Sequence, residues 1–350
     1  CPNIVQTGGH DYLPINPQGL PSLYDKWQNM WQSGYIPLPG RILDTHEVDE
    51  RSFVEWDHGH DFYAPQTFQD EQGRWILVGW LGTFDKHYTS TPDGLGWWHC
   101  LTVPRVVTRD EETGLLRQNP VPELRQLRGR QQVLRRNEPV RIEGRHADIS
   151  LEHISSEVGT LTIDDSFQIS YVQGRLAINY LDKESAAGRA DRFIRLQRLT
   201  SLRVLVDGSV VEVYANGGAD VFSSRWFPTE KPDLTVETTL EAERSFAYPM
   251  RAAMPELDAT AGAPDLAGPG RNAERAALSR GAIAEKDPLP LVAPAQLGKR
   301  RRDKRALSVP PGRELAACAN KPEGSFAVSG TSPGRRPSRQ PEPDRRRLPW

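Results

Sequence analysis

The sequence predicts an all-β protein made of two units, followed by a long C-terminal tail. Residues 1–250 contain many short runs of β-branched and aromatic residues separated by turn residues, and they hold eight of the nine Trp and all nine Tyr. Short strands at such intervals are typical of propellers, barrels and sandwiches. Residues 251–350 are dominated by Ala, Pro, Arg and Gly. That composition buries too little apolar surface to offset the entropy of ordering, so we expect residues 255–350 to be disordered.

The first unit is predicted from a meander of short strands. Trp75–Leu81 is a compact apolar run of strand-forming residues, and Phe53–Trp56 and Phe62–Phe68 are further candidates upstream of it. Polar and Gly-containing turns separate the three runs, which is the pattern of a propeller blade or a barrel. We therefore expect a first unit over residues 1–125, followed by a charged linker at 126–146.

The second unit is predicted from alternating strands between residues 147 and 254. Phe167–Val172, Leu202–Val206 and Val210–Tyr214 each alternate apolar and polar residues. The dipeptide Asp207-Gly208 between the last two strands is a strong signal for a two-residue hairpin turn. Antiparallel strands joined in this way indicate a β-sandwich.

The charge distribution divides at the same place as the composition. Residues 1–250 carry 25 Lys and Arg against 35 Asp and Glu, whereas residues 251–350 carry 19 against 11. The basic run Lys299–Arg305 resembles a nuclear or nucleic-acid signal, but we interpret it as solvated charge in a disordered tail because short basic runs are frequent. We therefore expect no nucleic-acid partner.

Other classes are excluded by what the sequence lacks. No stretch approaches the roughly 18 consecutive apolar residues of a membrane span, so we expect no membrane partner. The three Cys residues are far apart, which argues against a disulfide framework and against a structural zinc site. We expect no cofactor and no metal.

The densest group of chemically active residues is the segment Glu55–Tyr63, which combines carboxylates, imidazoles and aromatic rings. Aromatic faces flanked by carboxylates suit a sugar site, because the rings stack on sugar C–H groups and the carboxylates accept from hydroxyls. The alternative is a polar hairpin turn between two strand ends, which the residues alone favour. His58 and His60 have the spacing of a metal pair, but no third ligand is evident.

Three pairs of stretches resemble glycoside hydrolase family 32, which includes invertases, levanases and sucrose-6-phosphate hydrolases. The first resembles the motif D-x-G-x-D-F-Y-A-x-Q-T-F and the G-R-x-I-L-x-G-W run after it. The second resembles L-T-L-P-R-E-L with Q-x-P-V-P-E-L, although Val106 and Val107 replace the Glu-Leu pair. The third resembles R-x-L-V-D-x-S-x-V-E-x-F-A-N with V-F-T-S-R. The residues of this chain that match the first motif pair are Asp57–Phe68 and Asp70–Trp80. The second pair matches Trp98–Arg105 and Gln118–Leu124, and the third matches Arg203–Asn216 and Val221–Arg225.

The resemblance implies a five-bladed β-propeller followed by a β-sandwich, of which this chain would hold about blades three to five and the sandwich. It also implies retaining hydrolysis of β-fructofuranosides by two carboxylates. The family places these carboxylates in N-D-P-N-G and E-C-P motifs, and an R-D-P motif holds fructose hydroxyls. Neither N-D-P-N-G nor R-D-P occurs in the 350 residues, and Cys1-Pro2-Asn3 resembles E-C-P without its Glu. We therefore expect no catalytic residue in this chain and no activity from it alone.

The resemblance also implies which residues face the substrate. Asp61 and Tyr63 are expected to offer hydrogen bonds to fructose and Trp80 a rim surface, while packing between blades is the alternative for Tyr63 and Trp80. Cys1 would lie beside the missing acid/base. The expected partner is a small-molecule or oligosaccharide fructoside; the oligomeric state is open, and the expected localisation is cytoplasmic. The alternative function is a non-catalytic module that binds carbohydrate or a partner.

Overall fold

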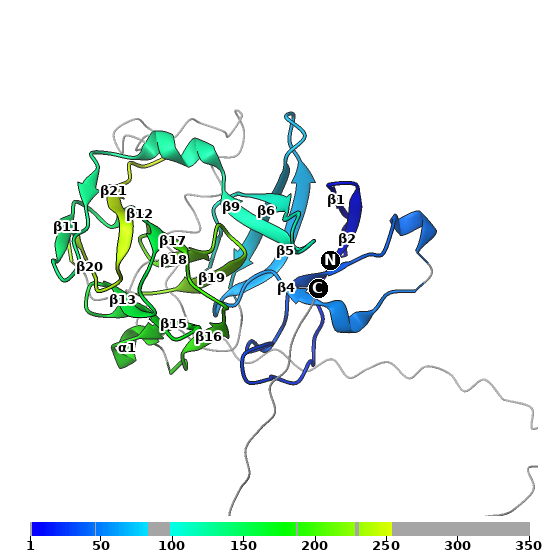
Figure 1. The fold of residues 1–350 in the computed structure, drawn as a ribbon, viewed down its shortest axis with the longest axis horizontal. Coiled ribbons are helices and arrows are strands. Elements are labelled where there is room, and N and C mark those ends of the chain that lie inside the picture. The colour runs from blue at the N-terminus through cyan, green and yellow to red at the C-terminus, as the bar shows by residue number, and fades with distance from the viewer. Residues whose placement is uncertain (1, 46, 83–98, 187, 228–230, 254–350) are drawn as a thin grey trace, which may run out of the picture. The chain divides into compact units, whose positions relative to one another are not determined.

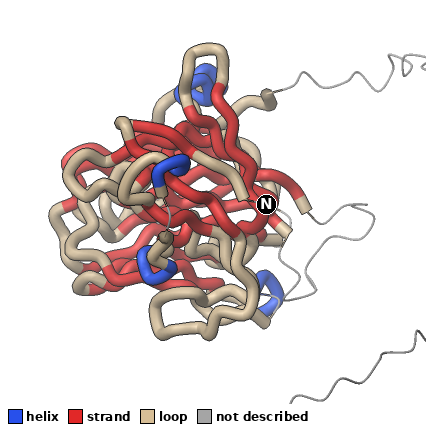
Figure 2. The backbone as a smooth tube through the Cα atoms, turned by 90° about the vertical axis from the view of Figure 1, so that its right-hand side faces the viewer, coloured by secondary structure: helices blue, strands red, loops and turns tan. Residues whose placement is uncertain are grey.

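The described part of the chain folds into four antiparallel β-sheets with almost no helix, as the sequence predicts (Figure 1). The structure is a computed structural model, and its described residues lie within one compact unit, residues 1–266. A single short helix, α1 (Lys183–Ala186), and three 3-10 turns accompany the strands of the described part. Strands and loops accordingly make up nearly all of the traced backbone in Figure 2. The described residues are 2–45, 47–82, 99–186, 188–227 and 231–253.

The first sheet has four strands in sequential order. Its strands are β1 (Val5–Thr7), β2 (His10–Ile15), β3 (Gly34–Pro37) and β4 (Val54–Glu55). Two 3-10 turns, η1 (Ile42–Asp44) and η2 (Glu50–Ser52), lie between β3 and β4. Residues 16–33 leave the sheet between β2 and β3 and return to it, with one antiparallel bridge between Gln18 and Trp31 near the two ends of this excursion.

The second sheet has the order β5-β6-β8-β9, and the short strand β7 also pairs with β6. A β-bulge interrupts β5 between Tyr63 and Gln66, where Ala64 has a φ of +45°. A bulge of this kind changes the direction of the neighbouring side chains. The Asn3 side-chain amide donates to the Thr67 carbonyl at 2.8 Å, so β5 lies beside the start of the first sheet. The strands are β5 (Phe62–Gln69), β6 (Trp75–Leu81), β7 (Cys100–Leu101), β8 (Arg105–Arg109) and β9 (Leu116–Pro120).

The two sheets share an apolar core. It contains four large aromatic side chains, Tyr12, Tyr35, Trp56 and Phe62, each almost completely buried. Gly79 on β6 makes room for one of them, because a Cβ at this position would lie 2.1 Å from the Phe62 ring. Val210 from the second half of the chain belongs to the same cluster, so the core continues across to the following sheets.

Residues 132–249 form two six-stranded sheets, in the orders β10-β21-β12-β17-β18-β19 and β11-β20-β13-β14-β15-β16. The 3-10 turn η3 (Pro122–Leu127) precedes them. The segment expected to be a linker supplies the first strand of each sheet. The strands are β10 (Gln132–Val133), β11 (Val140–Ile142), β12 (His146–Ile154), β13 (Val158–Ile163), β14 (Phe167–Val172), β15 (Arg175–Tyr180), β16 (Arg192–Arg195), β17 (Ser201–Asp207), β18 (Val210–Ala215), β19 (Asp220–Arg225), β20 (Leu234–Thr238) and β21 (Ala242–Pro249).

One apolar core joins these two sheets. Alternate residues of facing strands enter it, such as Leu161 and Ile163 from one sheet and Val204 and Val206 from the other. Such alternation is characteristic of a sandwich, in which each sheet has one buried face. The hairpin predicted at Asp207-Gly208 is present, but Asp207 pairs with Val210 and the two-residue loop is therefore Gly208-Ser209.

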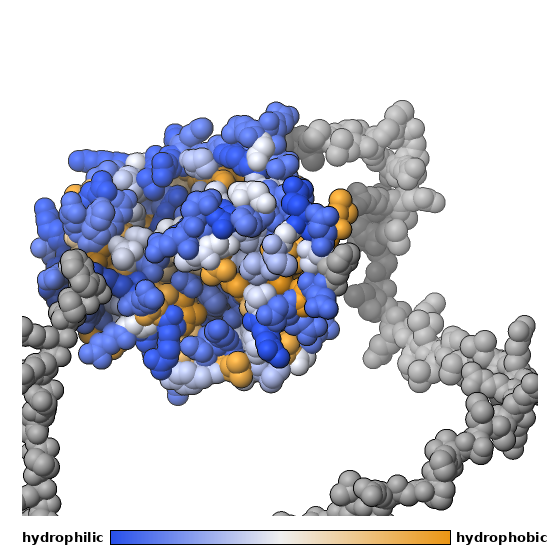
Figure 3. All heavy atoms as spheres, turned by 45° about the vertical axis from the view of Figure 1, so that its right-hand side comes forward, coloured by the Kyte–Doolittle hydropathy of each residue, from blue (hydrophilic) through white to orange (hydrophobic). Residues whose placement is uncertain are grey.

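Figure 3 shows that the surface on the side of the first two sheets is mostly polar, with separate apolar patches. Within the described part of the chain, no helix is long and apolar enough to cross a membrane. Cys1 and residues 255–350 lie outside the described residues, so the expectations for them stay predictions.

Candidate functional site

The candidate sugar-binding residues Tyr63 and Trp80 lie directly opposite each other on β5 and β6. Directly paired residues point to the same face of a sheet. Both side chains are half-buried. Trp80 is held in place by Gly82, whose Cβ position would lie 2.4 Å from the indole, and by His99, whose ring centroid is 5.1 Å away. The structure therefore brings these two predicted residues together on one face of the sheet, and sugar binding by them stays a prediction.

Two further residues join this surface that the sequence interpretation did not include. The Trp31 ring lies 5.2 Å from the Tyr63 ring at an angle of 42°, and the Gln18 side-chain amide donates to the Tyr63 hydroxyl at 3.2 Å. We call Gln18, Trp31, Tyr63 and Trp80 the aromatic surface. Neither Gln18 nor Trp31 belongs to a motif stretch, and no spacing pattern in the sequence connects them to Tyr63.

Asp61 occupies a different environment from the one expected. Its side chain is fully buried, and its two carboxylate oxygens accept from the Arg189 guanidinium at 2.7 and 2.8 Å. The backbone N–H of Arg225 also donates to it, at 2.7 Å. Because residues of the sandwich surround this carboxylate, its hydrogen bonds stabilise the contact between the two halves of the chain. A fructose hydroxyl has no access to it in this arrangement, so the geometry argues against the predicted substrate contact.

The whole segment from Asp57 to Asp61 follows strand β19 of the sandwich. The Ser223 backbone N–H donates to Asp57 at 2.7 Å, and the His58 N–H donates to the Val221 carbonyl at 2.8 Å. Gly59 lies so close to Ser223 that a Cβ would stand 2.1 Å from its carbonyl oxygen. Thus the first and third motif stretches lie against each other, and we call this region the inter-sheet contact.

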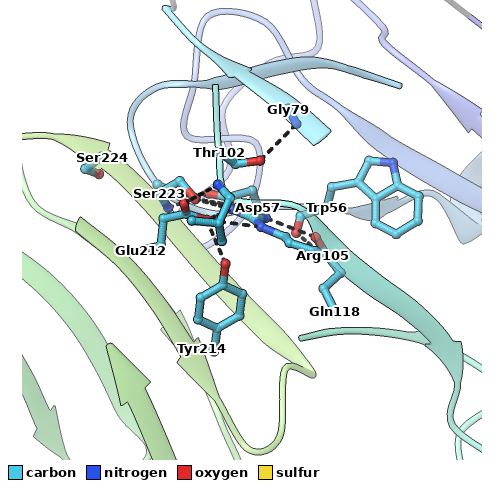
Figure 4. A network of polar contacts seen from close by, with 12 residues as sticks. Trp56, Asp57, Gly79, Thr102, Arg105, Gln118, Glu212, Tyr214, Ser223 and Ser224 are labelled. Atoms are coloured by element: carbon cyan, nitrogen blue, oxygen red, sulfur yellow. Dashed lines mark hydrogen bonds and ion pairs between the residues drawn. The ribbon is translucent and has the colours of Figure 1, made fainter. Parts of the chain in front are cut away.

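A buried ionic network forms the centre of the inter-sheet contact (Figure 4). The Arg105 guanidinium from β8 donates to Asp57 at 3.1 Å, to Gln118 at 3.0 Å and to Glu212 at 2.6 Å. It also donates to the Ser223 hydroxyl at 2.5 Å, and the Tyr214 hydroxyl donates to Glu212 at 2.7 Å. All of these side chains are buried. The second motif stretch thus contributes Arg105 and Gln118 to the same place as the other two.

The charges in this network do not cancel, since one guanidinium faces two carboxylates. Burial raises the pKa of Asp57, and the Arg105 charge and the hydrogen bonds from Ser223 oppose that shift. Arg105 uses all of its N–H donors, because Nε, Nη1 and Nη2 each point at an acceptor. Arginine is suited to this position because its planar fork satisfies several acceptors at once. The network is therefore a structural element, with no group left over for chemistry.

His60 and His58 do not act as a pair. His60 is fully buried, with its ring nitrogens 2.9 Å from the Ser224 hydroxyl and 2.8 Å from the Ala190 carbonyl. Burial and the nearby Arg192 and Arg189 hold its pKa well below the usual value, so this imidazole is neutral. Within the described residues, no group of three or more His, Cys, Asp and Glu side chains is arranged to hold a metal ion.

His58 lies between two carboxylates. Its ring nitrogens are 3.6 Å from Glu55 and 3.7 Å from Asp220, which connects β4 to β19. These three side chains line a cavity of about 340 Å³, with aromatic walls that include Tyr35 and Phe53. Burial alone would lower the pKa of His58, but the nearby carboxylates of Asp220 and Glu55 raise it to about 10. His58 is therefore positively charged at neutral pH.

The charge on His58 leads to a pH dependence of stability. Since its pKa is near 6.5 in an unfolded chain and about 10 in the folded one, its stabilising contribution is complete below pH 6.5 and is lost as the pH rises through 10. We expect His58→Gln to flatten the decline in the free energy of unfolding between pH 7 and pH 10, measured by urea titration. The exposed His10→Gln should leave the decline unchanged. An equal decline in wild type and His58→Gln would contradict this assignment.

Two bacterial sucrose-6-phosphate hydrolases have sequences similar to that of this chain. The chain is 35% identical over 240 residues to a sucrose-6-phosphate hydrolase of Bacillus subtilis, an alignment that covers 65% of this chain and 49% of that protein. It is 31% identical to a sucrose-6-phosphate hydrolase of Staphylococcus xylosus, covering 70% of this chain and 52% of that one. The chain thus spans about half the length of the curated relatives it matches.

Solved structures agree with the fold. The β-fructofuranosidase BmSUC1 of Bombyx mori superposes with a TM-score of 0.60 at 25% identity, over 73% of this chain and 55% of that one. The sucrose-6-phosphate hydrolase of Lactobacillus gasseri superposes with a TM-score of 0.63 at 22% identity, over the same shares. At that identity, the second match supports the fold alone.

Two family models match this chain. The N-terminal domain model of glycosyl hydrolases family 32 matches residues 1–120, and the C-terminal model of the same family matches residues 155–246. The first covers the two sheets that carry the aromatic surface, and the second covers most of the sandwich. Together they account for more than half of the sequence, and the chain belongs to glycoside hydrolase family 32.

Proposed function

We propose that the protein to which this chain belongs hydrolyses β-fructofuranosides, such as sucrose, sucrose 6-phosphate or fructans, with retention of configuration. The main support for this proposal is that all three motif stretches of the family contact one another within one folded unit. In the same unit, Tyr63 and Trp80 lie on one face of the second sheet. Relatives named sucrose-6-phosphate hydrolase and raffinose invertase support the substrate class.

We also propose that the 350-residue chain does not hydrolyse these substrates by itself. Retaining hydrolysis needs two carboxyl groups on either side of the scissile bond, about 5 Å apart. The sequence contains no N-D-P-N-G or R-D-P motif. Asp61, the carboxylate nearest to the aromatic surface in sequence, is fully buried against Arg189. It is therefore not a substitute for a missing nucleophile.

The test is an assay for fructose release from sucrose and from sucrose 6-phosphate. We expect no turnover by the 350-residue chain above a blank without enzyme. A longer protein that supplies the upstream carboxylates of the family is expected to be active, and replacing the Glu of its E-C-P motif by Gln should abolish that activity. Turnover by the 350-residue chain would contradict the proposed inactivity, and an inactive longer protein would contradict the proposed reaction.

A non-catalytic carbohydrate-binding module is the second candidate, because the aromatic surface is present without a catalytic pair. The two candidates differ in what the longer protein does. Hydrolysis by the longer protein favours the enzyme, whereas sugar binding without hydrolysis in both proteins favours the module.

A further inference from the structure

Residues 16–33, the excursion between β2 and β3, lie against Tyr63. Trp31 packs its ring on the Tyr63 ring at 5.2 Å, and Gln18 donates to the Tyr63 hydroxyl. The bridge between Gln18 and Trp31 brings the two ends of the excursion together. The Gln32 N–H donates to the Pro17 carbonyl at 3.1 Å beside this bridge. The excursion therefore presents both residues to the aromatic surface as one structural element.

The excursion is also fixed from the side of the sandwich. The Asn29 amide donates to the Gly59 carbonyl at 2.6 Å, and its oxygen accepts from the Arg192 guanidinium at 3.1 and 3.2 Å. Gln28 exchanges two hydrogen bonds with the backbone of Phe193, at 2.8 and 3.3 Å. These contacts are partly buried, so they restrain the position of the segment that leads into Trp31.

The side chains of the aromatic surface are exposed to solvent to different extents, and this exposure determines which of them a sugar can contact. Gln18 is exposed, while Trp31, Tyr63 and Trp80 are half-buried. The Gln18 amide nitrogen bonds Tyr63, and its carbonyl oxygen has no partner among the described residues. A half-exposed indole offers an apolar face, and a free amide oxygen accepts from a hydroxyl. A furanose presents C–H faces and hydroxyls, which are the complementary groups.

We propose that the two ends of this excursion, Gln18 and Trp31, form one wall of the fructoside-binding surface, in which Trp31 stacks on the sugar and Gln18 accepts from one of its hydroxyls. This inference rests on the proposed function and adds two binding residues to it. Asn29 is a positioning residue, because it touches Gly59 and Arg192 and acts through the placement of Trp31.

The experiment measures sugar binding by the 350-residue chain. Fructose and a levan oligosaccharide are titrated separately into the chain and followed by isothermal titration calorimetry and ligand-observed NMR. We expect Trp31→Ala to raise the dissociation constant about tenfold, as for the loss of one aromatic stacking contact, and Gln18→Ala to raise it about fivefold. The matched control is Tyr24→Ala. Tyr24 belongs to the same excursion and is 70% exposed, but it packs on Phe193. The Tyr24→Ala variant should leave the dissociation constant for the sugar unchanged.

The outcomes separate this inference from the proposed function. One outcome is that wild type, Trp31→Ala and Gln18→Ala bind the sugar with the same dissociation constant, while Tyr63→Ala binds it more weakly. In that case Trp31 and Gln18 are not binding residues, but a fructoside site at Tyr63 is still supported. If the wild-type chain binds neither sugar, the wall is also wrong, while hydrolysis by the longer protein would still support the proposed reaction. Circular dichroism and thermal unfolding of each variant show whether a loss of binding is a loss of folding.

A double-mutant cycle tests the positioning role of Asn29. In the wild-type background, Asn29→Ala is expected to weaken binding about threefold, since it removes hydrogen bonds that orient Trp31. In the Trp31→Ala background it should have no further effect, because the ring that it positions is gone. An equal effect in both backgrounds would overturn the positioning role.

Discussion

Replacing Arg105 by Met is expected to lower the free energy of unfolding by about 3–5 kcal/mol, the typical result of removing one partner from a buried ionic group. Met has a similar volume, so the loss comes from leaving the carboxylates of Asp57 and Glu212 buried without their shared cation. Both carboxylates are almost inaccessible to solvent, at 0% and 3% exposure of the side chain. Urea unfolding followed by tryptophan fluorescence measures the change.

The matched control for this variant is Arg135→Met. Arg135 pairs with Glu138 at the surface, where both side chains are more than half exposed. Surface pairs contribute about 0–1 kcal/mol, so this variant should be almost as stable as wild type. The triple variant Arg105→Met, Asp57→Asn, Glu212→Gln should recover part of the loss, because it removes the two uncompensated charges. Equal stability of Arg105→Met and Arg135→Met would refute the central role of the network.

Replacing Gly59 by Ala is expected to cost about 3 kcal/mol or more, at the upper end of the range for overpacked sites. The added Cβ would stand 2.1 Å from the Ser223 carbonyl oxygen and 2.2 Å from its nitrogen. Both are backbone atoms of β19, so no side-chain rotation relieves the clash and the two halves of the chain must move apart. Hydrogen exchange should therefore accelerate in β5 and β19 together.

Gly40→Ala is the control for the glycine variant. A Cβ at Gly40 meets no atom within 4 Å, and this glycine does not have a left-handed backbone. Its stability should stay within about 0.5 kcal/mol of wild type, as for most surface substitutions. If Gly59→Ala were as stable as Gly40→Ala, the close approach of Gly59 to Ser223 would be incorrect.

The sequence predicted the strands well where a local pattern determines them. Trp75–Leu81 and Phe167–Val172 are strands with the predicted bounds, because each is a short run of strand-forming residues between turns. The pattern did not separately indicate β1, β2 and β3, because β1 has only three residues, β2 contains Pro, and β3 contains both Gly and Pro. Their pairing depends on contacts with Trp56 and Phe62, which are distant in sequence.

The candidate site was predictable only in part, for the same reason. Tyr63 and Trp80 were identified from motif stretches that lie close together in sequence, and the antiparallel register of β5 and β6 brings them opposite each other. Asp61 was expected to face the sugar, but Arg189 lies 128 residues further along the chain, and no local pattern connects the two. A motif identifies residues that a fold requires, and it does not distinguish those that bind a ligand from those that join two sheets.

The inter-sheet contact limits how members of this family exchange parts by recombination. A chimaera joined between β9 and β10 would take Asp57 and Arg105 from one parent and Glu212 and Ser223 from the other. Where the second parent lacks the acidic residue Glu212, the guanidinium of Arg105 is left buried without two of its five hydrogen bonds. A crossover at this point is therefore tolerated only between parents that share these four residues, and the two halves are inherited as a matched pair.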